Sequence, residues 1–481
     1  MSWINLFEVF TYFLLILSLG WYLITNLQWY NYQIQRVVLK HHKPHWHMVY
    51  FITPYVLFYL LPFEYFAIYF YILYIGSVVL WHKKLDRSLV LTKRVIRFFA
   101  ILFVVSASLV VLCLALDGCS HLGLVLPLII TYFASSAVEK VIFLSFKEKA
   151  KQRLKSFETL KVVAITASFG KTSIKNYLFQ VISKKYNTYM TPRSVNTIAG
   201  ILKDVNSDLP QDTQIYIAEA GARAKGDIEE ITKFLEPQIA VIGSVGEQHI
   251  EYFKTLDNII YTKMEILSSP RLEYGFVHES VPILKYPKIK KFPDSLKIIK
   301  NNLEGIWFDL EVDGKVEHFY APILGSFNAI NLTAVILVAH QLGMSIDEIK
   351  FALSELKPVA HRLELIKAGG KLILDDSFNG NLEGMLEGIN LASMYNGRKV
   401  IVTPGIVEST EVANITLAKA INRVFDLVII TGDLNKKIFE KELKNKDLIF
   451  LKNKKELENV LAQETKLGDL ILFANDAPNF I

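Results

Sequence analysis

Residues 162–173 read VVAITASFGKTS, and this stretch decides the fold of the larger part of the chain. The apolar run 162–166 predicts a buried strand, and a loop of small residues then leads to Gly170-Lys171-Thr172 at the start of a helix. In that geometry the loop amides point at an anion, Lys171 can reach a β- or γ-phosphate, and the Thr172 hydroxyl can bind Mg²⁺. The usual pattern has Gly six residues before the Lys, where this chain has Ile165, so an ordinary helix cap is the alternative.

The pattern around this stretch is that of an α/β protein. Apolar strands are predicted at 161–166, 214–219 and 239–245, with helices at 173–183 and 228–235, and such alternation implies a parallel sheet covered by helices. A second series has predicted strands at 371–375, 399–403, 426–431 and 448–451. Residues 270–325 carry turn signals and predict a β-rich excursion. We therefore expect a central domain at 151–363 and a Rossmann-like C-terminal domain at 364–481.

The first 150 residues differ from the rest in composition. Hydrophobic residues make up 52% of the chain and the mean hydropathy is +0.30, because long uncharged apolar runs are concentrated before residue 150. Each run approaches the roughly 20 residues that cross a bilayer as a helix. Buried helices of a soluble core are the alternative, but so many runs so close together favour an α-helical membrane domain at 1–150. The five predicted spans are Val9–Leu27, Met48–Pro62, Tyr65–Trp81, Phe98–Leu116 and Leu122–Val138.

The distribution of charge predicts the orientation of this domain. Residues 1–150 contain 12 Lys and Arg against 6 Asp and Glu, whereas the remaining residues contain 41 of each. A neutral folded part argues against nucleic-acid binding, which needs a basic surface. Because basic loops stay in the cytoplasm, the N-terminus is predicted outside and the α/β part in the cytoplasm. The basic residues near the predicted spans are Arg36, Lys40, Lys43, Lys83, Lys84, Arg87, Lys93, Arg94, Arg97, Lys147, Lys149, Lys151 and Arg153.

Two further polar residues follow predicted strands. Glu219 ends the strand at 214–219, and His249 follows the strand at 239–245. Because strand carboxyl ends converge on the ligand in an open α/β sheet, both side chains can join Thr172 in binding Mg²⁺. A capping glutamate and a surface histidine are the alternatives.

Several motifs, in order along residues 160–481, resemble the Mur ligase family. The pattern is most similar to the member that adds D-alanyl-D-alanine to a UDP-N-acetylmuramoyl tripeptide. The His361-Arg362-Leu363 stretch resembles a Gly-Arg turn of the family, and 375–381 resembles its Asp-Asp-Ser-Tyr-Asn-Ala-Asn signature. The other matching stretches are 166–175, 191–196 with Gly200, 219–222, 226–228, 249–266 and 325–331.

The resemblance implies an ATP-dependent amide ligase of bacterial peptidoglycan precursor synthesis, at the cytoplasmic face of the inner membrane. ATP would phosphorylate the terminal carboxylate of the UDP-linked muramoyl peptide. The amine of D-alanyl-D-alanine would then attack the acyl phosphate and release phosphate. ATP and Mg²⁺ are the implied cofactors, and membrane lipid would surround the spans.

The resemblance also implies roles for individual residues. Catalytic roles would fall to Lys171, to His249, and to Lys263 carbamylated by CO₂. ATP would be bound by Ser168, Gly170, Lys171, Thr172, Ser173, Asn331, Arg362 and Asp376, with Asn331 at the adenine and Asp376 at the ribose. Mg²⁺ would be held by Thr172, Glu219, His249 and Lys263, and the substrate would contact Asn196 and Arg223.

The sequence departs from the family pattern in several places. Ala167, Phe327 and Arg223-Ala224 replace the usual residues, and membrane spans stand where members begin with a uridine-binding domain. Two alternatives therefore stay open. One is a Mur-type ligase that acts on a lipid-linked precursor. The other is a membrane transporter or receptor with a regulatory nucleotide domain, which the scarcity of ionisable residues within the spans disfavours.

Overall fold

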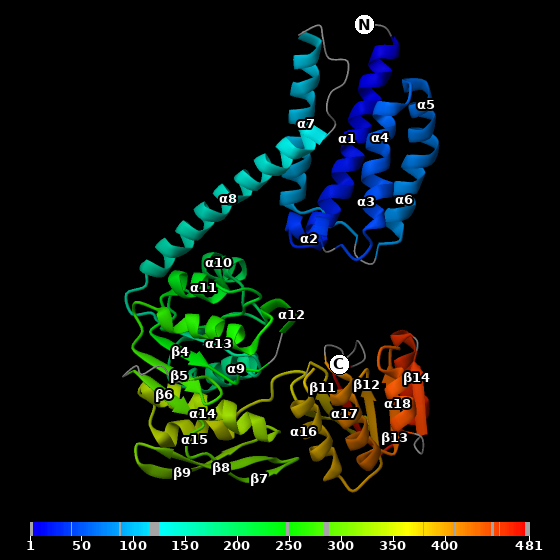
Figure 1. Cartoon of the computed structure of the whole chain (residues 1–481). Coiled ribbons are helices and arrows are strands. Elements are labelled where there is room, and N and C mark those ends of the chain that lie inside the picture. The colour runs from blue at the N-terminus through cyan, green and yellow to red at the C-terminus, as the bar shows by residue number, and fades with distance from the viewer. Residues whose placement is uncertain are drawn as a thin grey trace. The chain divides into compact units, whose positions relative to one another are not determined.

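The computed structural model describes residues 3–39, 41–85, 88–115, 125–246, 250–282, 288–378, 380–406, 409–443, 447–451 and 453–476. The chain divides into two compact units, Met1–Glu148 and Lys149–Ile481. The first unit is helical and the second is α/β (Figure 1).

Helical segments in the first unit pack around an aromatic and aliphatic core. Phe66, Phe70, Tyr74 and Phe98 are among its buried side chains. The segments are α1 (Trp3–Trp29), α2 (Ile34–Leu39), α3 (His45–His47), η1 (Met48–Ile52), α4 (Thr53–Leu60), α5 (Phe63–Ile68), η2 (Tyr69–Tyr74), α6 (Ile75–Lys83), α7 (Lys93–Ala115) and α8 (Val125–Lys155), the last of which continues into the second unit.

Ring contacts along α1 show in which direction the segments run. The α3–α4 run is antiparallel to α1, the α5–α6 run is parallel to it, and α7 is antiparallel again, as the unit's ribbon also shows (Figure 1). Successive segments therefore cross the bundle in alternating directions. The contacts are Tyr12 with Phe58 and Tyr22 with His47, then Phe7 with Phe63 and Trp21 with His82, and then Phe13 with Phe103 and Trp21 with Phe99.

Two of the basic loops meet at one end of this bundle. The Gln28 side chain makes two hydrogen bonds of 2.9 Å to the backbone of Val90. The Arg94 guanidinium lies 3.5 Å from the centroid of the Tyr32 ring. The segment that leads from α1 into α2 and the loop from α6 into α7 therefore lie on the same side, as the shared positive charge of the two regions predicted. Lys40 and Arg87, which belong to these loops, lie outside the described residues.

Four helices among the described residues are long and apolar enough to cross a membrane, so the prediction of five is wrong by this measure. The predicted second span forms the run His45–Leu60, whose segments have 3, 5 and 8 residues. At 1.5 Å per residue this run covers about 24 Å, less than the roughly 30 Å hydrocarbon core. Leu61 is extended before Pro62, and this break ends the helix. The four are Leu6–Trp29, Phe63–Lys83, Lys93–Leu112 and Val125–Lys155.

A six-stranded parallel sheet in the order β2-β3-β1-β4-β5-β6 begins the second unit. Its buried central strand β1 pairs with β3, where Ile165 lies opposite Glu219, and with β4, where Thr166 lies opposite Ile242. The predicted strands at 161–166 and 214–219 are confirmed, and the one at 239–245 ends earlier. The strands are β1 (Lys161–Thr166), β2 (Thr188–Met190), β3 (Ile215–Glu219), β4 (Ile239–Ile242), β5 (Tyr274–His278) and β6 (Ile289–Phe292).

Helices connect and cover these strands. The predicted helices at 173–183 and 228–235 correspond to α9 and α11, each with slightly different ends. Residues of α9 and α14 share one core with the sheet, including Leu178, Phe276 and Val335. The helical segments are α9 (Lys171–Ile182), α10 (Ile198–Ser207), α11 (Asp227–Leu235), α12 (Ile250–Phe253), α13 (Leu256–Met264), η3 (Glu265–Ser268), α14 (Ser326–Gln341) and α15 (Ile346–Ser354).

The predicted β-rich excursion at 270–325 contains two different structures. Strands β5 and β6 extend the parallel sheet, whereas β7 (Lys297–Asn302), β8 (Gly305–Val312) and β9 (Lys315–Ala321) form a separate antiparallel sheet. Phe308 and Phe319 of this second sheet are buried in the same core as α14.

The C-terminal part contains a second six-stranded sheet in the order β10-β11-β15-β12-β13-β14. All its strands are parallel except β10, which is antiparallel to β11. The four predicted strands correspond to β11, β12, β13 and β14, while β10 and the central β15 were not predicted. The elements are β10 (Glu364–Ala368), β11 (Lys371–Asp376), α16 (Leu382–Ser393), β12 (Lys399–Thr403), α17 (Glu411–Val424), β13 (Leu427–Thr431), α18 (Lys436–Glu442), β14 (Asp447–Leu451), η4 (Lys454–Glu456), α19 (Leu457–Glu464) and β15 (Leu470–Ala474).

Gly305→Ala is expected to destabilise the antiparallel sheet. Gly305 has φ +144°, and a Cβ atom there would lie 2.5 Å from the carbonyl oxygen of Ala321. The free energy of unfolding should fall by about 3 kcal/mol. Gly314→Ala is the matched control, because Gly314 has φ +77° with no atom within 4 Å of the added Cβ, and should cost only about 1 kcal/mol. Thermal unfolding of both variants measures the difference, and equal losses would contradict the close approach.

Candidate functional site

The loop between β1 and α9 is fixed by the segment that follows β4. The backbone N–H groups of Ser168 and Phe169 both donate to the Ser244 carbonyl, at 2.8 and 3.2 Å. The Ser168 hydroxyl donates to the Gly246 carbonyl at 2.9 Å. The loop is therefore held in place before any ligand binds, and α9 begins directly after it at Lys171.

Gly170 is required at its position for two reasons. Its φ of +81° lies in the left-handed region, and a Cβ atom would lie 2.5 Å from Asn331 Oδ1. Asn331 is buried near the start of α14 and donates to Asn328 Oδ1 at 3.1 Å. The structure thus brings Asn331, a predicted nucleotide contact, against the loop.

The ammonium of Lys171 curls back onto the loop. It donates to the carbonyl oxygens of Ala167 at 2.6 Å and Ser168 at 3.0 Å. Desolvation lowers the pKa of Lys171 to about 8, with Arg362 adding to this shift and Glu219 opposing it. These influences show that Arg362 and Glu219 lie within electrostatic reach of the loop lysine.

Glu219 is the centre of the polar cluster at the carboxyl edge of the parallel sheet. It is 1% exposed. The Thr172 hydroxyl donates to its Oε2 at 3.1 Å, and the Asn196 amide donates to its Oε1 at 3.2 Å. The structure thus brings together three predicted site residues that are separated in the sequence. The Thr172 hydroxyl and the Glu219 carboxylate are oxygen donors of the kind that Mg²⁺ prefers.

Lys175 is a member of this cluster that sequence reasoning missed. Its side chain is fully buried, and its ammonium lies 3.3 Å from Glu219 Oε2. It also donates to the carbonyl oxygens of Thr191, at 2.9 Å, and Arg193. Desolvation lowers the pKa of Lys175, with Glu219 opposing the shift. The sequence did contain a signal for this role. Lys175 lies one turn after Lys171 on the apolar side of α9, where a cation needs a buried partner.

Lys263 is buried in the last turn of α13. Desolvation, with a smaller effect of Lys171, lowers its pKa to about 7, while Glu219 opposes the shift. The structure therefore places Lys263 within electrostatic reach of the same cluster, and its ammonium loses a proton more readily than that of an exposed lysine.

Arg362 lies in the turn before β10, and Asp376 is the last residue of β11. The Arg362 guanidinium donates to the Phe378 carbonyl at 2.9 Å. Desolvation lowers the pKa of Arg362, and Asp376 and Glu219 are the main charges that oppose this shift. Asp376 ends β11 and is 1% exposed.

The remaining predicted residues have different outcomes. Ser173 is buried in the first turn of α9. Arg223 is exposed, and its backbone N–H donates to the Asp227 carboxylate at 2.8 Å, so the described contacts do not join its side chain to the cluster. His249 lies outside the described residues, and so does Asn379 of the signature at 375–381.

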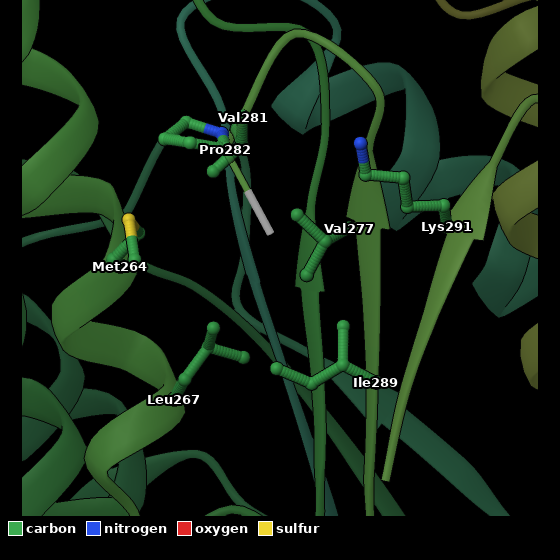
Figure 2. Close-up of a pocket in the computed structure, with 7 residues that line it drawn as sticks. All are labelled: Met264, Leu267, Val277, Val281, Pro282, Ile289 and Lys291. Carbon is green, nitrogen blue, oxygen red and sulfur yellow. The ribbon is translucent and has the colours of Figure 1, made fainter. Parts of the chain in front are cut away.

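A small pocket lies beside this region without containing any predicted site residue. Figure 2 shows its side chains, most of them apolar, coming from the end of α13, from η3, from the strands β5 and β6, and from the turn after β5. The pocket is lined by Met264, Leu267, Val277, Val281, Pro282, Ile289 and Lys291.

Within the part of the chain that the structure describes, no group of three or more His, Cys, Asp or Glu is placed to hold a metal ion.

Comparison with known proteins gives the class of protein that this fold and loop define. Residues 165–339 match the Mur ligase middle domain. The resemblance to the Mur ligase family that the motifs indicated is therefore confirmed, and the α/β part has the fold of that family.

The particular relatives are MurF enzymes. A UDP-N-acetylmuramoyl-tripeptide–D-alanyl-D-alanine ligase of Bacillus subtilis is 28% identical over 350 residues, which are 68% of this chain and 76% of that protein. MurF from Thermotoga maritima in complex with ADP is 24% identical with a TM-score of 0.58, covering 69% of this chain and 79% of its own. MurF from Acinetobacter baumannii is 21% identical with a TM-score of 0.60, covering 69% and 77%. This chain is thus MurF-like, with an additional N-terminal helical unit.

Lys175→Met is expected to destabilise the protein strongly. It removes the cation from a buried ion pair and leaves the Glu219 carboxylate without its charge partner, which costs about 3–5 kcal/mol. Lys184→Met is the control, since Lys184 pairs with Glu355 where both side chains are 45% exposed, and such a pair contributes about 0–1 kcal/mol. Thermal unfolding compares the two variants. Equal stability of Lys175→Met and the unaltered protein would show that Lys175 does not compensate Glu219.

Proposed function

We propose that this chain is an ATP-dependent amide ligase that joins D-alanyl-D-alanine to a UDP-N-acetylmuramoyl tripeptide in peptidoglycan precursor synthesis. The observation that carries the proposal is the buried Glu219 carboxylate, which holds the Thr172 hydroxyl of the phosphate loop on one oxygen and Asn196 on the other. The proposed phosphate site and the proposed substrate residue thus share one carboxylate, within residues that match the Mur ligase middle domain. The MurF relatives carry that activity in their names.

The reaction requires two transfers at the terminal carboxylate of the acceptor. A carboxylate oxygen attacks the γ-phosphorus of ATP, and ADP leaves as the acyl phosphate forms. The amine of D-alanyl-D-alanine then attacks the acyl carbon, loses a proton, and expels inorganic phosphate as the amide forms. The protein has to align the reactants and neutralise the charge that builds up on the phosphoryl group.

The ATP site of this proposal is built on the phosphate loop. Lys171 exchanges its two carbonyl contacts for phosphate oxygens, where a charged donor stabilises the transition state. The loop residues Ser168, Gly170 and Ser173 surround the phosphates. Asn331, Arg362 and Asp376 contribute the adenine, phosphate and ribose contacts.

The residues present also fit Mg²⁺. Thr172 and Glu219 offer hard oxygen ligands, and Mg²⁺ commonly takes one or two such protein groups and completes its shell with water and phosphate. Bound there, the ion would neutralise phosphate charge during transfer. His249 is the further ligand in this proposal.

In this proposal Lys263 carries a carbamate, which would help to hold a second Mg²⁺. Only an uncharged amine reacts with CO₂, and burial lowers the pKa of Lys263 to about 7. An ammonium has no lone pair for a metal, whereas the carbamate presents two oxygen atoms. The depressed pKa therefore supports the modification that the resemblance implied.

We propose that the helical unit anchors the enzyme in the bacterial inner membrane with the ligase part in the cytoplasm. Helix α1, the run His45–Leu60, the α5–α6 run and α7 cross the bundle in alternating directions, and Val125–Lys155 is a further candidate span. The segment that leads from α1 into α2 and the loop after α6 meet at one end. With the short run counted as a crossing the total is odd, which agrees with an N-terminus outside and the ligase part in the cytoplasm. Membrane lipid is then a partner of the unit.

A lipid-linked acceptor is the second candidate substrate. The apolar helices favour it, because an enzyme anchored in the bilayer meets lipid-linked substrates at a high local concentration. In either case Asn196 and Arg223 are the proposed contacts of the acceptor.

Full-length protein in detergent should form the UDP-linked pentapeptide from UDP-tripeptide, D-alanyl-D-alanine and ATP, and Lys171→Ala should reduce kcat about 100-fold to 1,000-fold. Lys203→Ala, an exposed lysine on α10, should leave kcat unchanged. For the unaltered protein, ATP affinity should weaken as pH rises past about 8, because Lys171 then loses its charge. Product from a lipid-linked acceptor alone would favour the second candidate, and ligation undiminished in Lys171→Ala would refute the phosphate-loop assignment.

Lys263→Ala should be nearly inactive, and formate should restore part of its activity. Formate supplies the two oxygen atoms of the carbamate, whereas methylamine supplies only the cation of an unmodified lysine. Ligation rates with each addition separate the two roles. Rescue by methylamine, or full activity without any addition, would rule out the carbamate.

A further inference from the structure

The backbone is strained on both sides of Arg362. His361 has φ +63° and Leu363 has φ +56°, a region that favours glycine, and β10 begins at the next residue. The motif that this turn resembles has glycine at the position of His361. Strain at a non-glycine residue persists only where surrounding contacts hold it, and it often marks a functional position.

The His361 side chain makes the contact that holds this turn. Its Nδ1 lies 2.7 Å from Asp375 Oδ2. Asp375 is fully buried, and its other oxygen accepts from the Ser377 backbone N–H at 3.1 Å. Because a buried carboxylate must be hydrogen-bonded, His361 supplies one of the hydrogen bonds that Asp375 needs.

Two further contacts tie the same turn to residues 375–378. The Phe378 N–H donates to the His361 carbonyl at 3.3 Å, and Arg362 donates to the Phe378 carbonyl at 2.9 Å. The rings of His361 and Phe378 lie 5.1 Å apart. Arg362 and Asp376, the proposed phosphate and ribose contacts, are thus each next in sequence to one member of the His361–Asp375 pair.

We propose that His361 is a positioning residue for the nucleotide. Its hydrogen bond to Asp375 fixes the conformation of the strained turn. The fixed turn holds Arg362 and Asp376 in the arrangement that binds a nucleoside di- or triphosphate. His361 itself does not touch the nucleotide. This inference rests on the proposed ATP-dependent function and assigns a role to a residue outside the predicted site.

Binding of ADP to the full-length protein in detergent, measured by calorimetry, tests the inference. His361→Gly accepts the left-handed backbone but loses the bond to Asp375, so the Kd for ADP should rise at least tenfold. His361→Asn also tolerates this backbone and keeps an N–H donor, so its Kd should stay within threefold of the unaltered value. His318→Asn alters an exposed histidine on β9 that lies 2.5 Å from Asp309, and it should leave the Kd unchanged.

Kinetics separate positioning from a purely structural role. In His361→Gly the KM for ATP should rise with the Kd, while the KM for the acceptor peptide changes less than twofold. A lower melting temperature of His361→Gly with an unchanged Kd would overturn this inference but not the ATP-dependent function. The same holds if the asparagine variant binds ADP as weakly as the glycine variant. No ADP binding by the unaltered protein would overturn the ATP-dependent function, and this inference with it.

Discussion

The candidate site depends on the burial of one carboxylate, that of Glu219. A buried charge needs hydrogen bonds and a counter-charge, and these come from two separate places in the chain. Thr172 and Lys175 come from α9, and Asn196 comes from the loop before α10. The same requirement that stabilises the carboxylate therefore sets the phosphate loop beside the proposed acceptor contact. The function follows from where these donors converge.

The sequence predicted the parts of this arrangement whose cause is local. A continuous apolar run predicts a buried strand, and a small-residue loop before a Gly-Lys-Thr predicts a phosphate site, because backbone geometry determines both. Lys175 was missed because its burial depends on Glu219, 44 positions further along the sequence. β15 was missed because its place between β11 and β12 is a matter of sheet order, which a five-residue strand does not reveal. The segment Met48–Pro62 was predicted as a full span because hydropathy depends only on composition. In the structure the helical run 45–60 is shorter than a span, because the break at Leu61 and Pro62 ends it.

As the membrane anchor that we propose, the N-terminal unit would change the physical problem that the ligase part has to solve. A soluble ligase meets its acceptor by diffusion in three dimensions, whereas a ligase anchored by apolar helices meets it at the membrane surface. There the basic end of the bundle also attracts anionic groups, by about 1 kcal/mol for each basic residue near an anionic surface. Arg94 and Lys43 already lie over the Tyr32 and Trp46 rings, so their charges are held at that end. The proposed anchor would thus contribute location and electrostatics, while the chemistry stays with the α/β part.

The two strained residues beside Arg362 show how stability and function compete in this fold. Sequences normally agree with their local backbone, and violations concentrate at functional sites. At position 361 glycine would remove the strain, yet the chain has a histidine whose Nδ1 reaches a buried carboxylate. A side chain that costs backbone energy and is held by one specific partner fixes a single conformation of the turn more narrowly than glycine does, because glycine leaves the turn free to adopt others. In a ligase that must align ATP with an acceptor, that loss of freedom is the useful property, since alignment supplies much of the rate.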